Sequence, residues 1–503
     1  MPPKSPGNDH PDVTGTPLLQ QAFDSEVFRQ QGHQLVDRLA DYLQQVLRRA
    51  DFPVMPWREP AELRQEWQQL LADPLPISFV ELTEKLLQQS IHLHHPRCCG
   101  HQVAPPAPIT ALAELFSALL NNSMAVYEVG PAGTVIEKAV LGWLAQRLGM
   151  APGADGILTS GGSLGNLTGL LAARRERGGS DVWEEGTCGL PMEVMVSAES
   201  HYSVARALKI MGLGSQGLIK LPVNERLQVR PELLETMLLA ARAKGRQVIA
   251  IVANACSTST GAYDPLPEIG EFAKKNGLWF HVDAAHGGAA RFSPKYRHLV
   301  QGLEEADSLV IDFHKMMLCP ALATAVLFRD GTVLKRIFSQ KASYLLPEQQ
   351  QVPWQDIARN TIECTKKMMG LKVMMLLKTV GEGIFSEYVT RVYDLSRDFA
   401  TVLQSESDFR LAVEPQANIV CFRHQPDQVP AGQWGEYNAR LRRQLVAHGR
   451  FYIVQTTIAG EIYLRLTLMN PFTNLGDLQE LLVEIRHFGQ QIRQNENHGK
   501  EKC

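Results

Sequence analysis

Short apolar runs rich in β-branched residues alternate with segments of helical periodicity between about residues 155 and 330. This alternation is typical of an α/β fold in which a mainly parallel central sheet is flanked by helices. Because the ligands of such sheets collect where strands end and helices begin, chemistry-bearing side chains are expected at those strand ends. The predicted strands cover residues 193–197, 247–253, 278–283, 308–312 and 323–328.

Helical patterns lie on both sides of this region. Apolar residues recur at helical spacing from Leu18 to Ala50, which predicts one long amphipathic helix that needs a partner surface. A long exposed loop is predicted over residues 339–356, where Ser, Gln and Pro occur without periodicity. Further helices are predicted over residues 62–71, 109–121, 134–148 and 357–380, the third of them capped by Gly149.

These patterns divide the chain into five predicted parts. The central three are a helical N-terminal arm, a large domain built on the sheet, and a small α+β domain in which helix and strand alternate. In order, the parts are a disordered N-terminus over 1–16, the arm over 17–108, the large domain over 109–380, the small domain over 381–492 and a disordered tail over 493–503.

Charge and cysteine content exclude several classes of protein. The 503 residues include 50 Lys and Arg against 53 Asp and Glu, without a long basic run, so we expect no nucleic-acid partner. The most apolar stretch, Met368 to Val380, is interrupted by two lysines, and the N-terminus lacks the apolar middle of a secretory signal. We therefore expect a cytoplasmic protein without membrane association. Eight scattered cysteines without C-x-x-C spacing predict neither disulfides nor a metal site.

A glycine-rich turn opens the first helix of the sheet region, in the sequence Thr159-Ser160-Gly161-Gly162-Ser163-Leu164-Gly165-Asn166. Gly162 and Ser163 would let the backbone approach an anion closely, and the free N–H groups of the helix start would donate to a phosphate. The alternative is a glycine turn followed by a serine N-cap, which is at least as common. The motif is neither a Walker loop nor G-x-G-x-x-G.

Two further strand ends carry polar residues. Asp283 ends the strand over 278–283, where a buried acid needs a cation or several hydrogen bonds, although helix capping is the commoner role of an isolated strand-end Asp. His314 and Lys315 follow the next strand among apolar neighbours. Desolvation would lower the pKa of the Lys315 amine and make it a nucleophile, unless the side chain reaches solvent. Together, a phosphate cradle, an acid and a lysine match the three groups by which a protein can bind pyridoxal phosphate (PLP), namely its phosphate, its ring nitrogen and its aldehyde.

The chain from about residue 92 to 475 resembles the group II PLP-dependent amino-acid decarboxylases. The resemblance implies the fold type I architecture of PLP-dependent transferases, PLP as cofactor, and a homodimer with shared active sites. The matching motifs are His95-Pro96-Arg97, Thr159 to Ser163, His201-Tyr202-Ser203, Gly261 to Pro265, His281 to Ala285 and His314-Lys315.

The resemblance also implies a role for each matching residue. Lys315 would bond covalently to the cofactor and Asp283 would keep its ring nitrogen protonated. His201 would stack on one face of the ring, although it could also be an ordinary polar residue between strand and helix. The cofactor-binding set implied in this way is Gly162, Ser163, His201, Thr258, Asp283, Ala285, His314 and Lys315.

Two residues outside the sheet region complete the implied site. Arg465 resembles the arginine that binds the substrate carboxylate, with a surface salt bridge as the alternative. Tyr344 lies in the predicted loop and matches the tyrosine that donates a proton to the substrate carbon, with simple packing as the alternative. The implied catalytic residues are thus Lys315, Tyr344 and His201.

The sequence departs from the family pattern at two places. Asp312 stands where many relatives carry Asn or Ser near the phosphate, and an acid there would repel a phosphate dianion unless it is turned away or protonated. Cys256-Ser257 replaces the usual Gly-Thr before Thr258, so the local backbone could differ.

The amino-acid sequences of several segments are most similar to those of the bacterial L-2,4-diaminobutyrate decarboxylases. This resemblance implies 1,3-diaminopropane as the product. The alternative is an acidic substrate such as glutamate, aspartate or cysteine sulfinate. Pocket charge discriminates the two, because a distal ammonium requires an acid such as Glu128 or a polar cage, whereas a distal carboxylate requires Arg or Lys. Since fold and cofactor do not fix the reaction, an aminotransferase, an aldolase or a non-catalytic scaffold are alternatives of other classes.

Overall fold

A seven-stranded sheet forms the centre of the molecule. In this computed structural model, which describes residues 16–49, 53–179, 181–187, 189, 191–338 and 354–500, the strand order is β1-β7-β6-β5-β4-β2-β3. β7 runs antiparallel to both of its neighbours, and the remaining pairs are parallel. The strands are β1 (Asp155–Thr159), β2 (Met192–Ser197), β3 (Leu218–Leu221), β4 (Gln247–Asn254), β5 (Trp279–Asp283), β6 (Ser308–Asp312) and β7 (Thr324–Phe328).

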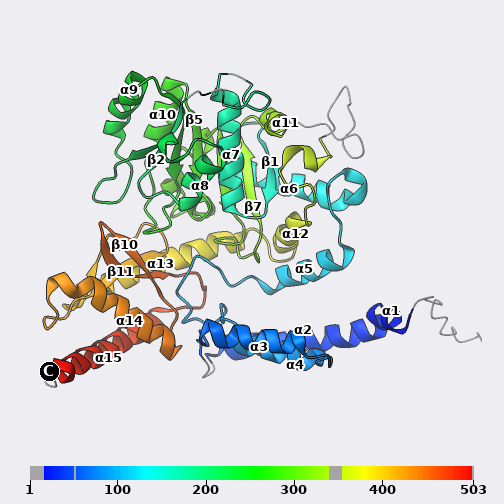
Figure 1. The fold of residues 1–503 in the computed structure, drawn as a ribbon, viewed down its shortest axis with the longest axis vertical. Coiled ribbons are helices and arrows are strands. Elements are labelled where there is room, and N and C mark those ends of the chain that lie inside the picture. Colours follow the sequence, from blue (N-terminus) through cyan, green and yellow to red (C-terminus); the bar gives the residue numbers. More distant parts are fainter. Residues whose placement is uncertain are drawn as a thin grey trace, which may run out of the picture.

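The predicted α/β class with a mainly parallel sheet flanked by helices is confirmed. All five predicted strands are present within one residue of their expected bounds. The two strands outside that prediction, β1 and β3, form the edges of the sheet. Helices α7 to α10 lie against the sheet in Figure 1. They are α7 (Gly162–Arg177), α8 (Tyr202–Ile210), α9 (Leu234–Ala243) and α10 (Leu266–Asn276).

Helix α7 crosses β4 to β7 at unusually close range. A Cβ atom on Gly165 would lie 2.8 Å from Cγ1 of Val310, and one on Gly169 would lie 2.5 Å from Cε1 of His281. Both approaches are shorter than real Cβ contacts, so only glycine lets the helix pack this closely. The N-terminus of α7 is thereby held against the ends of β5 and β6.

The N-terminal arm consists of four helices that lie together, away from the sheet, in Figure 1. The single helix predicted from Leu18 to Ala50 is wrong, because Asp24 interrupts it. Its Oδ1 atom accepts hydrogen bonds from the backbone N of Glu26 (2.8 Å) and of Val27 (3.1 Å), and so starts a second helix. The four helices are α1 (Pro17–Ala22), α2 (Ser25–Leu47), α3 (Pro60–Ala72) and α4 (Phe79–Gln89).

The other predicted helices are present with shifted bounds. The helix predicted over 134–148 begins at Pro131, which stands at its first position, and ends at Gly149 in the left-handed conformation. The helix predicted over 357–380 is wrong in its first half. There Oγ1 of Thr361 accepts from the backbone N of Glu363, and the backbone N of Lys366 donates to the carbonyl of Ser123. These helices are α5 (Pro108–Leu120), α6 (Pro131–Leu148) and α12 (Met369–Thr379), and a short helix that was not predicted, α11 (Leu334–Ile337), follows β7.

A second, four-stranded antiparallel sheet with strand order β10-β11-β9-β8 lies in the C-terminal part of the chain. Helix α15 continues to Lys500, where the sequence predicted a disordered tail from residue 493. Of the disordered N-terminus predicted over 1–16, residues 1–15 lie outside the described residues. The elements of this part are α13 (Gly383–Ser405), α14 (Trp434–His448), α15 (Leu475–Lys500), β8 (Phe409–Leu411), β9 (Ile419–His424), β10 (Val454–Ile458) and β11 (Glu461–Thr467).

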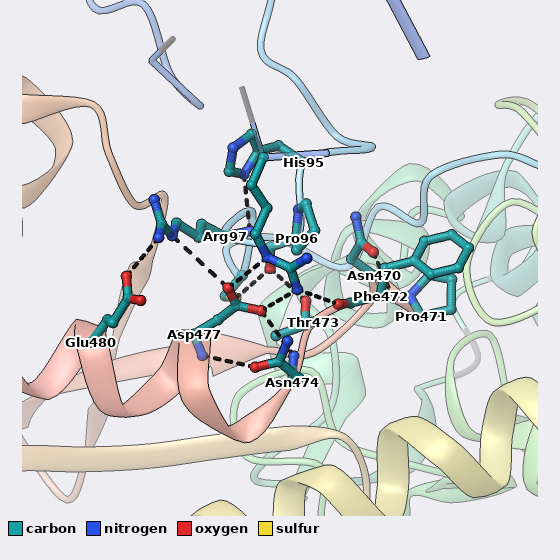
Figure 2. A network of polar contacts seen from close by, with 12 residues as sticks. His95, Pro96, Arg97, Asn470, Pro471, Phe472, Thr473, Asn474, Asp477 and Glu480 are labelled. Carbon is teal, nitrogen blue, oxygen red and sulfur yellow. Dashed lines mark hydrogen bonds and ion pairs between the residues drawn. The ribbon is translucent and has the colours of Figure 1, made fainter. Parts of the chain in front are cut away.

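A polar network joins the arm to the C-terminal helix (Figure 2). Both oxygens of Asp477 on α15 accept hydrogen bonds of 3.0 Å from Arg49, and Arg97 donates to Glu480 at 2.5 Å. Thr473 Oγ1 donates to the backbone carbonyl of Pro96 at 2.5 Å. The His-Pro-Arg motif at 95–97 therefore anchors the arm rather than contributing side chains to the cavity at the strand ends.

Within the described parts of the chain, no helix has both the length and the apolar character needed to span a bilayer.

Candidate active site

A cavity of about 440 Å³, here called the strand-end cavity, opens where β5 and β6 end. Because these strands are adjacent and parallel, the residues that follow them meet at one edge of the sheet. The structure brings together all eight residues predicted to bind the cofactor, which line this cavity: Gly162, Ser163, His201, Thr258, Asp283, Ala285, His314 and Lys315.

The N-terminus of α7 forms one wall of the strand-end cavity. The first N–H groups of a helix have no partner within it and attract anions. A Cβ atom on Gly162 would lie 3.4 Å from both carboxylate oxygens of Asp312 and 3.6 Å from Cβ of Ala285. The missing side chain therefore leaves open a cradle that a phosphate fits.

Asp283 lies at the end of β5, and its side chain is held by hydrogen bonds. Its Oδ2 accepts from Nδ2 of Asn166 at 2.8 Å, and its Oδ1 accepts from the backbone N of Ala285 at 3.2 Å. Only 8% of the residue is exposed, yet it lines the cavity. Neither helix capping nor a salt bridge within the described residues occupies this carboxylate. It is available to a cation in the cavity.

Lys315 is paired with an acid instead of being isolated among apolar groups. Its Nζ lies 3.0 Å from Oδ2 of Asp312. Burial would lower the pKa of the Lys315 amine, but the carboxylates of Asp312 and Asp283 outweigh it and raise the pKa above its usual value. The expectation of a lowered pKa is therefore wrong for the free lysine. The amine is held as an ammonium beside Asp312.

Asp312 is almost completely buried beside the cradle, and its charge is balanced by its neighbours. Oγ1 of Thr324 donates to it at 2.5 Å, and Nε2 of His314 lies 3.5 Å away. Burial would raise the pKa of Asp312, but Lys315, His314 and Thr324 together lower it. Asp312 is thus ionised, and Lys315 offsets the repulsion that a phosphate would otherwise meet.

His201 caps α8 and lines the strand-end cavity. Its Nδ1 lies 2.7 Å from Oγ of Ser203 and accepts from the backbone N of Ser203 at 3.3 Å. Burial lowers the pKa of the imidazole below its usual value, so the ring is neutral near pH 7. A neutral ring of fixed orientation is suited to stacking on a flat cofactor.

A second cavity of about 460 Å³, here called the mouth cavity, shares His201 and Thr258 with the strand-end cavity. Arg465 on β11 lines it and is 5% exposed. Its Nε donates to the carbonyl of Ser259 (3.0 Å) and its Nη2 to that of Thr258 (2.7 Å). Among the described residues it has no acidic partner, so the surface salt bridge is not formed and donors remain for a carboxylate.

Two candidates from the sequence are not placed at the site. Tyr344 and most of the predicted loop over 339–356 lie outside the described residues. Glu128, the acid considered for a distal ammonium, is exposed and lines neither cavity. The acid in the mouth cavity is instead Glu199, which follows β2.

Two residues of the site were not assigned from sequence. Asn166 donates to Asp283 and lines the strand-end cavity. It follows Ser163 by three positions, so it lies on the same face of α7, and this spacing could have identified it. Glu199 stands two positions before His201 and carried no comparable signal.

The strand-end cavity fits PLP in its donor set and in its charge. It combines a helix N-terminus for the phosphate, the carboxylate of Asp283 for a protonated ring nitrogen, and the amine of Lys315 for an aldehyde. These are the same three cofactor groups for which the sequence suggested partners.

Comparisons with known proteins agree with this geometry. The model of the pyridoxal-dependent decarboxylase conserved domain matches residues 60–425. An L-2,4-diaminobutyrate decarboxylase of Acinetobacter baumannii is 30% identical over 433 residues, covering 83% of this chain and 84% of that protein. The acidic amino acid decarboxylase GADL1 of Mus musculus is 30% identical over 456 residues, covering 87% and 82%. The crystal structure of mouse CSAD in apo form has a TM-score of 0.80 at 26% identity, covering 90% and 99%.

Proposed function

Because the chain belongs to the pyridoxal-dependent decarboxylases, which are carboxy-lyases that act on amino acids with PLP, we propose that its substrate is L-2,4-diaminobutyrate. The product would be 1,3-diaminopropane, released with carbon dioxide. Membership of this family favours decarboxylation over the aminotransferase and aldolase alternatives.

The residues of the strand-end cavity have separate roles in binding the cofactor. When bound, PLP withdraws electrons from the α-carbon of an attached amino acid and weakens the bond to its carboxylate. In this proposal Lys315 forms the covalent attachment, Asp283 keeps the ring nitrogen protonated, and Gly162 and Ser163 hold the phosphate. His201 and Ala285 pack on opposite ring faces, while His314 and Thr258 complete the lining. These roles are supported by the shared cavity.

Arg465 and Tyr344 act on the substrate itself. Arg465 would bind the carboxylate with the donors that its two carbonyl partners leave free. Tyr344 would donate the proton that replaces the carboxylate on the α-carbon. Its role remains a prediction, because Tyr344 lies outside the described residues.

The charge of the mouth cavity carries the substrate assignment. Oε2 of Glu199 accepts a hydrogen bond of 2.6 Å from Oγ of Ser259, and no cation among the described residues pairs with this half-buried carboxylate. The Lys and Arg side chains that line the two cavities are Lys315 and Arg465. With Lys315 assigned to PLP and Arg465 to the α-carboxylate, neither is left for a distal carboxylate. A distal ammonium, in contrast, finds Glu199.

Glu199→Gln is expected to raise KM for L-2,4-diaminobutyrate about 10-fold with a smaller effect on kcat, because a charge-assisted hydrogen bond to the distal ammonium is lost. Carbon dioxide and amine release are measured for diaminobutyrate, glutamate, aspartate, cysteine sulfinate and tryptophan. The matched control is Glu387→Gln, an exposed glutamate on α13, which should leave KM unchanged.

Two results would count against the substrate assignment. If the unaltered enzyme prefers glutamate, aspartate or cysteine sulfinate, the acidic alternative replaces the diaminobutyrate assignment. GADL1, an acidic amino acid decarboxylase, supports that alternative, since it is 30% identical to this chain, as the diaminobutyrate decarboxylase is. An unchanged KM in Glu199→Gln would show that the distal group binds elsewhere.

We also propose that the enzyme is a homodimer with shared active sites. Large apolar side chains are exposed on α1, α2 and α5 and at Phe23 between the first two, and a monomer rarely leaves so many in water. A second copy of this chain is the expected partner, since the arm contributes so few buried residues of its own. The most exposed members are Phe23 (78%), Leu18 (77%), Leu119 (69%) and Phe116 (57%).

A charge placed among these exposed apolar side chains should prevent association. Phe116→Glu on α5 is expected to convert the dimer to monomer at micromolar concentration, because burying an unpaired carboxylate costs several kcal/mol. Light scattering coupled to size-exclusion chromatography measures the mass. The control is Leu239→Glu on α9, a leucine with similar exposure of 55%. A monomeric unaltered enzyme, or dissociation of the control alone, would contradict this proposal.

A further inference from the structure

A continuous chain of buried hydrogen bonds lies behind Asp283. Nε1 of Trp279 and Nδ1 of His281 each lie 2.8 Å from Oγ of Ser308. Nε2 of His281 lies 3.0 Å from Oδ1 of Asn166. All four residues are at most 4% exposed, so the protein itself must satisfy their polar atoms.

The donors and acceptors of this chain can be ordered from its two ends, the Trp279 indole and the Asp283 carboxylate. An indole nitrogen only donates, so Trp279 donates to Ser308. A carboxylate only accepts, so Asn166 presents Nδ2 to Asp283 and Oδ1 to Nε2 of His281. Nδ1 of His281 then accepts from the Ser308 hydroxyl. Burial lowers the pKa of His281 to about 4, so the neutral ring carries its one proton on Nε2. That proton is donated to Oδ1 of Asn166. The orientation of the Asn166 amide is thereby fixed.

The amide of Asn166 links this chain of hydrogen bonds to two residues of the site. Its Nδ2 donates both to Oδ2 of Asp283 at 2.8 Å and to Oγ of Ser203 at 3.0 Å. The hydroxyl of Ser203 is then free to donate to Nδ1 of His201, 2.7 Å away. His201 must therefore carry its proton on Nε2. One amide thus fixes the carboxylate of Asp283 and the tautomer of His201 together.

Helix α7 makes room for the chain. A Cβ atom on Gly169 would lie 2.6 Å from Nδ1 of His281 and 3.2 Å from Oγ of Ser308. Any larger residue there would displace the imidazole that orients Asn166. Gly169 thus allows both the close packing of α7 on β5 and β6 and the order of the hydrogen-bond chain.

We propose that Asn166 is a positioning residue that holds the Asp283 carboxylate and selects the Nε2–H tautomer of His201, oriented by the buried chain Trp279, Ser308 and His281. This inference rests on the proposed roles of Asp283 and His201 toward PLP, but not on the identity of the substrate. The alternative is that the chain only satisfies buried polar groups. That would affect stability alone.

The experiment compares Asn166→Leu and Ser308→Ala with the unaltered enzyme in three measurements. The ring ¹⁵N shifts of labelled histidines in the apoprotein report the tautomers, with the His201 signals assigned by their loss in His201→Gln. Titration of the apoprotein gives the dissociation constant of PLP, and urea unfolding gives stability. Asn166→Leu is expected to mix the His201 tautomers and to weaken PLP binding about 10- to 100-fold, with a similar loss in kcat at saturating PLP. Ser308→Ala should act in the same direction more weakly.

Two control variants separate positioning from stability. Ser308→Thr keeps the hydroxyl and should restore the tautomers and the PLP affinity. Ser396→Ala removes another fully buried serine hydroxyl, which bonds the carbonyls of Tyr393 and Ala417, and should lower stability without changing either property.

The proposal is overturned if Asn166→Leu and Ser308→Ala keep the Nε2–H tautomer of His201 and bind PLP within 2-fold of the unaltered enzyme. If the unaltered apoprotein itself fails to bind PLP, the proposed function fails instead. The tautomer measurement does not use PLP, so the two failures are distinguishable.

Discussion

Lys315→Arg is expected to abolish decarboxylation, with kcat lowered by at least about 10⁴-fold. Arginine keeps the positive charge that Asp312 requires, 3.0 Å from Nζ of Lys315, so the buried acid remains paired and the fold should persist. The guanidinium, however, cannot release a proton to become a nucleophilic amine. The covalent attachment of PLP is therefore lost while the local electrostatics are largely kept. Carbon dioxide release and the visible absorbance of the PLP-treated protein measure both consequences.

The control for this variant is Lys138→Arg. The Lys138 side chain is 17% exposed, against 21% for Lys315, and it is likewise paired with an aspartate, Asp155, outside the site. This variant should keep full activity and full absorbance. Activity above a few per cent in Lys315→Arg would mean that another amine carries the cofactor.

Asp283→Asn is expected to lower kcat about 10³-fold at saturating PLP and to weaken PLP binding. The amide has the shape of the carboxylate but only one acceptor oxygen, so the variant loses the buried negative charge and one of the two hydrogen bonds from Asn166 and Ala285. Removing one partner of a buried ion pair costs about 3–5 kcal/mol, which corresponds to this range of rate. Steady-state kinetics and titration of the apoprotein with PLP measure the two effects.

A matched substitution tests whether burial alone explains such a loss. Asp264 is 4% exposed, and its carboxylate accepts 2.8 Å hydrogen bonds from the backbone N of Val229 and of Asn254. It lines neither cavity. Asp264→Asn should reduce stability while keeping kcat near that of the unaltered enzyme. Equal losses of kcat in both variants would refute a specific role for Asp283.

The sequence predicted the interior of the sheet better than its edges. The inner strands contain runs such as Val248 to Val252, whose β-branched residues are buried on both faces. β1 contains Gly156, where a Cβ atom would lie 2.2 Å from the carbonyl oxygen of Val326. A residue required for close packing thus weakened the local strand signal. The N-terminal helix break at Asp24 was missed because one capping side chain outweighed a continuous apolar pattern.

The site was predictable where chemistry follows directly from a strand end. Asp283 and Lys315 were recognised because each follows a predicted strand, and the parallel arrangement brings them into one cavity. The pKa of Lys315 was not predictable, because it depends on the tertiary contact with Asp312. The partnership of Asn166 with His281, 115 positions apart, likewise exists only after α7 has packed on β5.

The network around Asp477 has a consequence for biosynthesis. Arg49 and Arg97 bond residues of α15 that lie 428 and 383 positions later in the chain, so this anchorage cannot form until α15 has left the ribosome. Because chains fold from the N-terminus during translation, the sheet would be complete before the arm is fixed. A nascent chain released before α15 forms would therefore carry an unanchored arm, and this arm, with Phe23 and Leu18 exposed as they are in the described structure, would be a source of aggregates.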